Sequence, residues 1–336
     1  MSKINILYEL VFCCLLTLSV SLRLAAMEEQ KPIVYISLEG GGMHMCAALE
    51  VLQRLEKENN RPIAELVDGI IGLSSGAIIG AHLLSPTEPK WSAKNLKDNL
   101  PQMLDEAAKG SAIGGMLSSL FSNFSSFKTL FMNSIGPAPM QNACGHLLMA
   151  AYNTETHVAK IFDSHEESDA NIPIWNITQA SASISARAGI EWAWGATVIQ
   201  YDANNFSSGW VDGGMAPQEQ KKPIYETLAN KLKDIYPDRQ IYIYSFSGGP
   251  DTFKGYTGAQ SHVQEWQDEN ISIIRFMPMY SDIPESNFLG ISTWYQMLLN
   301  TSLENIDNID SHFFTDELEH NEAYINMFKL IAARFE

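Results

Sequence analysis

Two glycine-bearing clusters in the first quarter of the sequence have the residue types and spacing needed to activate a serine. The first is a run of glycines with the two residues after it, Gly40, Gly41, Gly42, Met43 and His44. The second, Gly72-Leu73-Ser74-Ser75-Gly76, is a G-x-S-x-G pattern. This pattern is typical of a serine on a sharp turn from strand to helix, where glycines let the backbone turn tightly. Ser74 is therefore the candidate nucleophile.

The chemistry of an activated serine also needs a site for negative charge and a base. If the glycine run leads from a strand into a helix, its free backbone N–H groups and the helix dipole point at the space beside Ser74. A serine hydroxyl must pass its proton to a neighbouring base. Asp212, directly before Gly213 and Gly214, is the candidate base. Alone, an Asp-Gly-Gly triplet is most often a turn; the two glycine clusters give it a functional interpretation.

The elements that must position these residues follow from the hydrophobic patterns. Residues 33–38 are predicted to form a buried strand, 44–57 a helix, 66–71 a second strand and 75–84 a helix that is buried all round. Further strands are predicted at 147–152, 158–163, 197–201, 240–246 and 271–277, with a hairpin between the first two, and further helices at 92–108, 173–187, 222–236, 291–300 and 315–335. This alternation predicts an α/β fold with a mostly parallel sheet.

Composition limits the classes of function. The chain has 336 residues, of which 46% are hydrophobic and 18% charged, enough for a substantial core. The formal net charge of −17 argues against a nucleic-acid partner and against purely electrostatic docking to an anionic membrane. Four cysteines show no metal-ligand spacing and no disulfide framework, and we predict no metal or cofactor. The absence of repeats and linkers favours one catalytic domain.

The N-terminus and a phenylalanine-rich segment leave alternatives open. Residues 1–26 are typical of a signal peptide or, as an alternative, of a short uncleaved anchor, and either predicts a secreted or membrane-associated protein. If Met27 is the true start, the protein is cytoplasmic. Apolar residues between 117 and 131 recur at helical spacing. They predict either a lid or interfacial helix that touches lipid, or an amphipathic helix packed on the core.

Three segments, in this order, resemble the motifs of the patatin-like phospholipases. They are Leu38-Glu39-Gly40-Gly41-Gly42-Met43, then Gly72-Leu73-Ser74-Ser75-Gly76, then Val211-Asp212-Gly213-Gly214. The resemblance implies a three-layer patatin-like fold over residues 31–280. The helices predicted at 291–300 and 315–335 make residues 281–336 a C-terminal helical segment packed on the same domain. The resemblance also implies a lipid acyl hydrolase with a Ser74-Asp212 dyad and an oxyanion loop at Gly40 to Met43. The implied partner is a lipid or membrane-derived acyl ester, reached by transient contact with a membrane surface.

The sequence departs from the family pattern beside the glycine run. Glu39 stands where the family usually has Asp, and His44 and Met45 stand where it usually has Arg or Lys followed by Gly. A permanent positive charge beside the oxyanion loop is therefore missing, and His44 would supply one only when protonated.

Two competing functions remain. One is an α/β-hydrolase with a Ser-His-Asp triad, in which His262, His312 or His320 supplies the base. The glycine run and Ser74 are separated by only about one βαβ unit, whereas the oxyanion loop of such a hydrolase usually precedes its serine by considerably more chain. This short separation argues against the triad. The other is an inactive relative that binds lipid or a protein partner.

Overall fold

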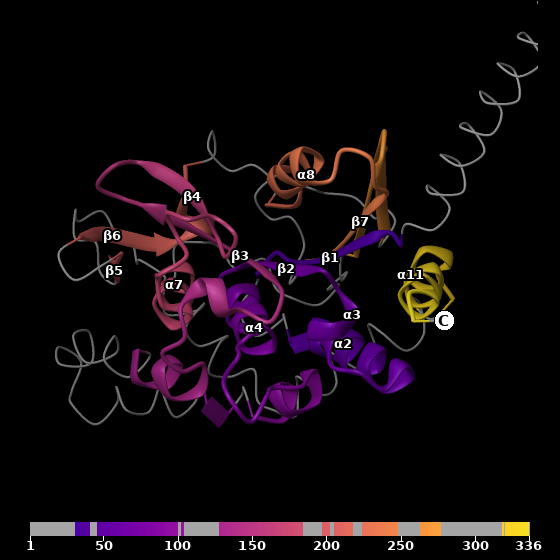
Figure 1. The fold of residues 1–336 in the computed structure, drawn as a ribbon, viewed down its shortest axis with the longest axis horizontal. Helices are drawn as coiled ribbons and strands as arrows, with labels where there is room; N and C mark the ends of the chain where they lie inside the picture. The colour runs from indigo at the N-terminus through magenta and orange to yellow at the C-terminus, as the bar shows by residue number, and fades with distance from the viewer. Residues whose placement is uncertain are drawn as a thin grey trace, which may run out of the picture.

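The computed structural model describes residues 31–40, 46–99, 102–103, 128–183, 197–201, 205–217, 224–247, 263–276, 318 and 320–335. These residues form one mixed sheet with helices on both faces (Figure 1). The described strands are β1 (Ile33–Leu38), β2 (Gly69–Leu73), β3 (His146–Asn153), β4 (Val158–Asp163), β5 (Thr197–Gln200), β6 (Phe206–Asp212), β7 (Ile241–Phe246), β8 (Val263–Asp268) and β9 (Ile271–Phe276).

The centre of the sheet is parallel and its margins are antiparallel. The order is β5-β6-β3-β2-β1-β7-β9-β8, and β4 also pairs with β3. Strands β3, β2, β1, β7 and β9 run parallel, whereas β4, β5, β6 and β8 add antiparallel pairs. Each parallel strand therefore ends at the same side of the molecule, which we call the carboxyl end of the sheet; the opposite side is the amino end.

The helices complete three layers, with α2, α4 and α7 on one face of the sheet and α8 on the other (Figure 1). The described helices are α2 (Cys46–Asn59), α3 (Ile63–Leu66), α4 (Ser75–Leu83), α7 (Ile174–Ser181), α8 (Ile224–Ile235) and α11 (Glu322–Ala333), with short 3-10 turns η2 (Met140–Asn142) and η3 (Gly213–Met215). The predicted three-layer α/β class with a mostly parallel sheet is confirmed.

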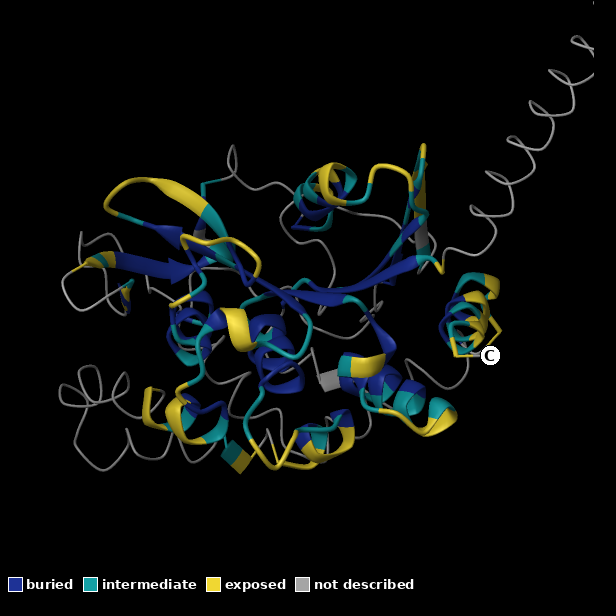
Figure 2. Cartoon of the chain, in the orientation of Figure 1, coloured by how far each residue is buried: buried dark blue, intermediate teal, exposed yellow. Residues whose placement is uncertain are grey.

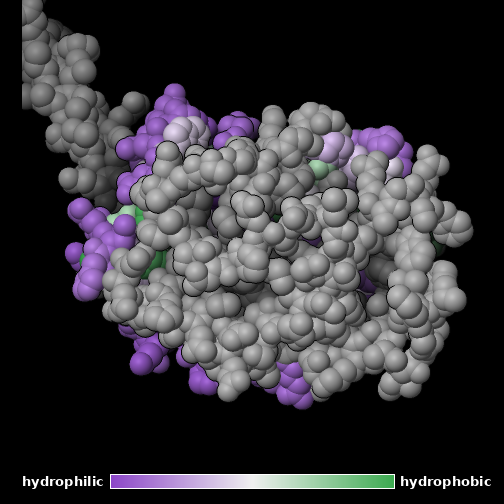
Figure 3. Space-filling view, turned by 180° about the vertical axis from the view of Figure 1, so that it is seen from behind, coloured by the Kyte–Doolittle hydropathy of each residue, from purple (hydrophilic) through white to green (hydrophobic). Residues whose placement is uncertain are grey.

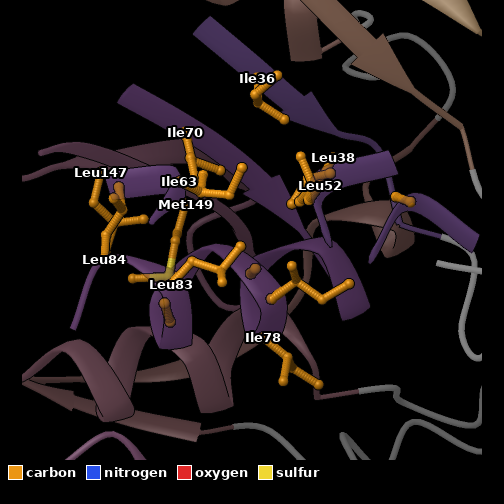
Figure 4. Close-up of a cluster of buried hydrophobic side chains, with 14 of the residues drawn as sticks. Ile36, Leu38, Leu52, Ile63, Ile70, Ile78, Leu83, Leu84, Leu147 and Met149 are labelled. Atoms are coloured by element: carbon orange, nitrogen blue, oxygen red, sulfur yellow. The ribbon is translucent and has the colours of Figure 1, made fainter. Parts of the chain in front are cut away.

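Burial explains why the central strands are almost continuously apolar. All six residues of β1 are buried, because helices cover both faces of the sheet (Figure 2). Ile70, Met149 and Leu83 belong to the core between the sheet and α4 (Figure 4). Ile71 and Leu148 belong to a second core on the α8 face. Described residues visible on the rear of the molecule are mostly hydrophilic (Figure 3).

Most predicted elements are confirmed. The strands at 33–38, 147–152, 158–163, 197–201, 240–246 and 271–277 and the helices at 44–57, 75–84 and 222–236 correspond to described elements with similar bounds. Residues 93–99 and 102–103 of the helix predicted at 92–108 are helical, and its other residues from 100 onward lie outside the described residues. The helix predicted at 291–300 also lies outside them. The last helix begins later than predicted, at Glu322, where the Asn321 side chain accepts two backbone N–H groups.

Two further elements have bounds that differ from the prediction. The strand predicted at 66–71 runs from Gly69 to Leu73, because residues 63–66 form a short helix and Asp68 instead accepts a hydrogen bond from the Val34 N–H. The helix predicted at 173–187 ends at Ser181. The chain turns there so that the Ser183 carbonyl accepts the Asp212 N–H.

Two strands were not predicted from the sequence. The first half of β6 is rich in serine and glycine, and β8 is a polar strand at the margin of the sheet. Strands of this kind have weak hydrophobic patterns because one side faces solvent.

Only the end of the predicted apolar stripe belongs to the described residues. Phe131, the last residue of the predicted apolar stripe, is buried in the core, which agrees with packing; residues 117–127 of the stripe lie outside the described residues. No helix in the described part of the chain combines the length and apolar character required to cross a bilayer.

Candidate active site

Ser74 lies at the carboxyl end of the sheet, on the turn between β2 and α4. Its backbone angles, φ 57° and ψ −126°, lie in a region that residues with a side chain rarely adopt. A Cβ at Gly72 would lie 2.5 Å from the Ala77 Cα, and one at Gly76 would lie 2.2 Å from the Leu38 carbonyl oxygen. Both glycines are therefore needed for the turn, as the G-x-S-x-G pattern predicts.

A second serine holds this turn in place. The Ser181 hydroxyl accepts a hydrogen bond from the Ser74 N–H at 3.1 Å and donates one to the Ala150 carbonyl at 2.6 Å. It thereby bridges β2 and β3 at the point where the chain leaves β2. Ser181 is fully buried at the last turn of α7. Sequence reasoning missed this residue, because a serine in a helix of small residues has no distinctive pattern.

The register of β3 brings Ser74 and Asp212 together. Ala150 pairs with Leu73 of β2, and the next residue, Ala151, pairs with Asp212 of β6. Both alanines also pair with β4, which must occupy the other side of β3. β2 and β6 therefore lie on the same side of β3 and meet end to end. Leu73 and Asp212 occupy successive positions, about 3.3 Å apart along β3, and Ser74 directly follows Leu73.

The Asp212-Gly213-Gly214 triplet allows the end of β6 to lie close to the end of β2. Asp212 is buried, and its Oδ1 accepts the Gly214 N–H at 2.7 Å. This bond fixes the carboxylate at the start of η3. A Cβ at Gly213 would lie 2.7 Å from the Leu73 Cδ1 and 3.2 Å from the Ala150 carbonyl oxygen. A larger residue would thus push the triplet away from the Ser74 turn.

Gly40 is the part of the glycine run that the structure describes. Its φ is +87°, and a Cβ there would lie 2.8 Å from the Leu73 carbonyl oxygen and 3.1 Å from the Ser74 Cβ. The run therefore starts against the turn that carries Ser74, and α2 begins shortly after it. Gly41, Gly42, Met43 and His44 lie outside the described residues, so their assignment to the oxyanion loop stays a prediction.

Glu39 forms an ion pair that the sequence did not indicate. Its Oε1 accepts hydrogen bonds from the Arg275 Nε at 2.7 Å and the Ser245 Oγ at 2.6 Å, and its Oε2 accepts one from the Arg275 Nη2 at 2.5 Å. The three residues come from the ends of β1, β9 and β7. A charged pair is thus placed directly before the glycine run.

Of the three histidines proposed for a triad, only His320 belongs to the described residues. His320 is exposed before α11, and His262 and His312 lie outside the described residues. His82 lies eight residues after Ser74 in α4, with its Nδ1 2.7 Å from the Ile78 carbonyl oxygen and its Nε2 2.9 Å from the Ser134 Oγ. Burial lowers the pKa of His82 to about 4, so it is neutral at pH 7.

A separate cluster of titratable groups lies at the amino end of the sheet. The Tyr35 hydroxyl and the His146 Nδ1 are 2.5 Å apart, and the His146 Nε2 is 2.7 Å from the Asp163 Oδ1. Lys231 also pairs with Asp163. Burial alone would raise the pKa of Asp163, but hydrogen bonds from His146 and Lys231 outweigh it and hold the pKa well below its ordinary value. The described residues contain no group of three or more His, Cys, Asp or Glu placed to bind a metal ion.

Comparison with known proteins assigns the family. The model of patatin-like phospholipases matches residues 36–219, more than half of the chain, and this range contains Ser74, Asp212 and the glycine run. The chain belongs to the patatin-like phospholipase family. No match was found among curated protein sequences.

One solved structure similar to this patatin-like phospholipase is the human GIVD cytosolic phospholipase A2 in complex with methyl gamma-linolenyl fluorophosphonate. The similarity covers 75% of this chain and 49% of that chain, with 11% sequence identity and a TM-score of 0.42. The chain therefore spans about half the length of that protein.

Proposed function

We propose that this patatin-like protein is a lipid acyl hydrolase that cleaves carboxylic esters through an acyl-Ser74 intermediate, with Asp212 as the general base. The observation that supports this proposal most directly is the position of both residues on one side of β3, at the junction of β2 and β6. Family membership supports an acyl ester of a lipid as the substrate class.

In the first half of the proposed reaction, Asp212 accepts the proton of the Ser74 hydroxyl while the Ser74 oxygen attacks the ester carbonyl. The carbonyl oxygen becomes an oxyanion, which the N–H groups of Gly41 to Met43 stabilise. Removing one such donor typically slows acyl transfer about 10²- to 10³-fold. The intermediate then expels the alcohol, which takes the proton from Asp212, and Ser74 carries the acyl group.

In the second half, water replaces the alcohol. Asp212 accepts a proton from the water as its oxygen attacks the acyl carbonyl, and the same N–H groups stabilise the second oxyanion. Collapse of this intermediate releases the carboxylic acid and returns the proton from Asp212 to Ser74. The steps use only water and groups of the protein.

The test is hydrolysis of p-nitrophenyl butyrate and release of fatty acid from phosphatidylcholine vesicles. We expect Ser74→Ala and Asp212→Asn to lower kcat by about 10³-fold or more, because each removes a group that acts in every step. Circular dichroism controls for folding. Equal, background rates for the wild type and Ser74→Ala on both substrates would contradict the proposal and favour an inactive, lipid-binding relative.

The same assay separates the dyad from a Ser-His-Asp triad. His262→Gln, His312→Gln and His320→Gln should each retain activity close to that of the wild type. Near-complete loss of activity in any one of them, with folding intact, would assign the base to that histidine instead of Asp212.

A further inference from the structure

A row of polar residues crosses the face of the sheet that α8 covers, close to the carboxyl end of the sheet. Ser37 of β1, Ser245 of β7 and Arg275 of β9 pair in register, and Glu39 lies two residues beyond Ser37 on the same side of the chain. Nearer the amino end, the same face is lined by apolar residues such as Ile243 and Ile273. The row is therefore a local departure from an otherwise apolar surface, next to the candidate active site.

We propose that the ion pair between Glu39 and Arg275 is a positioning pair, which sets the direction in which the chain leaves β1 and so holds Gly40, the first residue of the proposed oxyanion loop, against the Ser74 turn. This inference rests on the proposed function. Neither residue touches the reacting atoms in this proposal; both act through the backbone of the glycine run.

The geometry of the pair is suited to fixing a direction. Two nitrogens of the Arg275 guanidinium bind the two oxygens of the Glu39 carboxylate, and Ser245 adds a third donor. A two-point contact of this kind restricts rotation as well as distance. Only 12% of the Glu39 side chain and 10% of the Arg275 side chain are exposed, so solvent screens the pair weakly. The guanidinium carbon also lies 5.7 Å from the ring centroid of Tyr225 on α8.

The backbone connects this pair to the Ser74 turn through Glu39 and the residue after it, Gly40. The Glu39 N–H donates to the Phe246 carbonyl at 3.0 Å, which extends the pairing of β1 and β7 beyond the end of β1. Gly40 follows with its positive φ and packs on the Leu73 carbonyl and the Ser74 Cβ. A rotation at Glu39 would therefore move Gly40 relative to Ser74 and change the direction in which the chain leaves the sheet.

The ion pair between Asp68 and Arg334 provides a matched control at the opposite end of β1. The Asp68 Oδ2 lies 2.7 Å from the Arg334 Nη2 and accepts the Val34 N–H at 2.7 Å. The exposed fractions, 26% for Asp68 and 12% for Arg334, show partial burial like that of the first pair. This pair also anchors β1, but it is remote from Ser74.

The experiment compares the two pairs by steady-state hydrolysis of p-nitrophenyl butyrate. Glu39→Gln and Arg275→Met should each lower kcat about 10- to 100-fold, because misplacing catalytic groups by about 1 Å has effects of this size. KM should change less than about 3-fold, because the loss falls on the transition state. The double variant should be no slower than the slower single variant, and Arg275→Lys should recover part of kcat. Asp68→Asn and Arg334→Met should leave kcat per folded molecule unchanged.

Hydrogen exchange gives a readout that does not depend on activity. Peptides covering residues 36–50 should exchange faster in Glu39→Gln than in the wild type, but not in Asp68→Asn. The positioning role is overturned if kcat and exchange in Glu39→Gln match the wild type, or if the Asp68 and Glu39 variants lose kcat equally. If the wild type itself is no faster than Ser74→Ala, the proposed function fails, and the exchange result alone then supports or overturns the positioning role.

Discussion

The carboxyl end of the central sheet contains a strained backbone and closely packed glycines, whereas the amino end contains a buried network of charged and aromatic side chains. At the carboxyl end, Ser74 has a positive φ, and Gly40 and Gly213 pack against the turn that carries it. At the amino end, Asp163 lies among His146 and Lys231. Both ends contain buried polar groups, but these groups are arranged for different purposes.

We expect this difference to separate chemistry from stability. The polar groups at the amino end bind one another, so removing one of them leaves its partners buried without a counter-charge. At the carboxyl end the hydrogen bonds of Ser181 and Gly214 are directed to the backbone of Ser74 and the side chain of Asp212. These hydrogen bonds fix the positions of Ser74 and Asp212. Substitutions at the amino end should therefore lower stability, and substitutions at the carboxyl end should mainly lower kcat.

The largest expected effect on stability is at Asp163. Asp163→Asn removes the carboxylate that His146 and Lys231 share, and breaking a buried ion pair typically costs about 3–5 kcal/mol of unfolding free energy. Urea denaturation measures this loss. Glu166→Gln is the control, because the Glu166 side chain is 58% exposed and lies 3.6 Å from Lys231, and exposed pairs contribute about 0–1 kcal/mol. An equal loss of unfolding free energy in both variants would contradict the expected role of Asp163 in stability. A fall in kcat per folded Asp163→Asn molecule would contradict the expectation that the amino end affects stability alone.

The next largest expected effect is a pH dependence of the unfolding free energy caused by His82, which lies near the end of α4. An unfolded histidine binds a proton near pH 6.5, whereas burial lowers the pKa of His82 in the folded protein to about 4. The unfolded state therefore binds more protons between these values. The contribution of His82 to stability is complete above pH 6.5 and is lost as pH falls toward 4, by roughly 3 kcal/mol.

Urea denaturation at a series of pH values between 7 and 4 checks this expectation. His82→Gln should show a shallower fall in unfolding free energy than the wild type, and His320→Gln should match the wild type because His320 is exposed. Parallel curves for the wild type and His82→Gln would show that His82 does not titrate as its burial predicts.

The smallest expected effect on stability, at the carboxyl end, should be accompanied by a loss of activity. Ser181→Ala leaves the Ser74 N–H and the Ala150 carbonyl without the bridging hydroxyl, at a cost of about 1–3 kcal/mol. It should also lower kcat about 10-fold by loosening the nucleophile turn. Ser183→Ala is the control, since the Ser183 hydroxyl is also buried but donates to the Gln179 carbonyl. If both variants lower kcat equally, Ser181 has no particular role in holding Ser74.

The sequence predicted the core of the fold because that core is locally encoded. Continuous apolar runs identify buried parallel strands, and β1, β3, β7 and β9 were found close to their predicted positions. β6 and β8 were missed because their polar residues match loop composition as well as strand composition. The start of β2 and the end of α7 were displaced because contacts distant in sequence, at Asp68 and Ser183, decide them.

By itself, the sequence determined the α/β class and the candidate residues Ser74, Gly40 and Asp212, since a sharp turn and a close backbone approach require glycines at fixed spacing. It could not show that β2 and β6 meet end to end beside β3, because strand register depends on pairing across the whole sheet. Only the tertiary structure placed Ser181 behind Ser74 and Arg275 against Glu39. These contacts join residues 107 and 236 positions apart in the chain, a separation at which local sequence patterns carry no information.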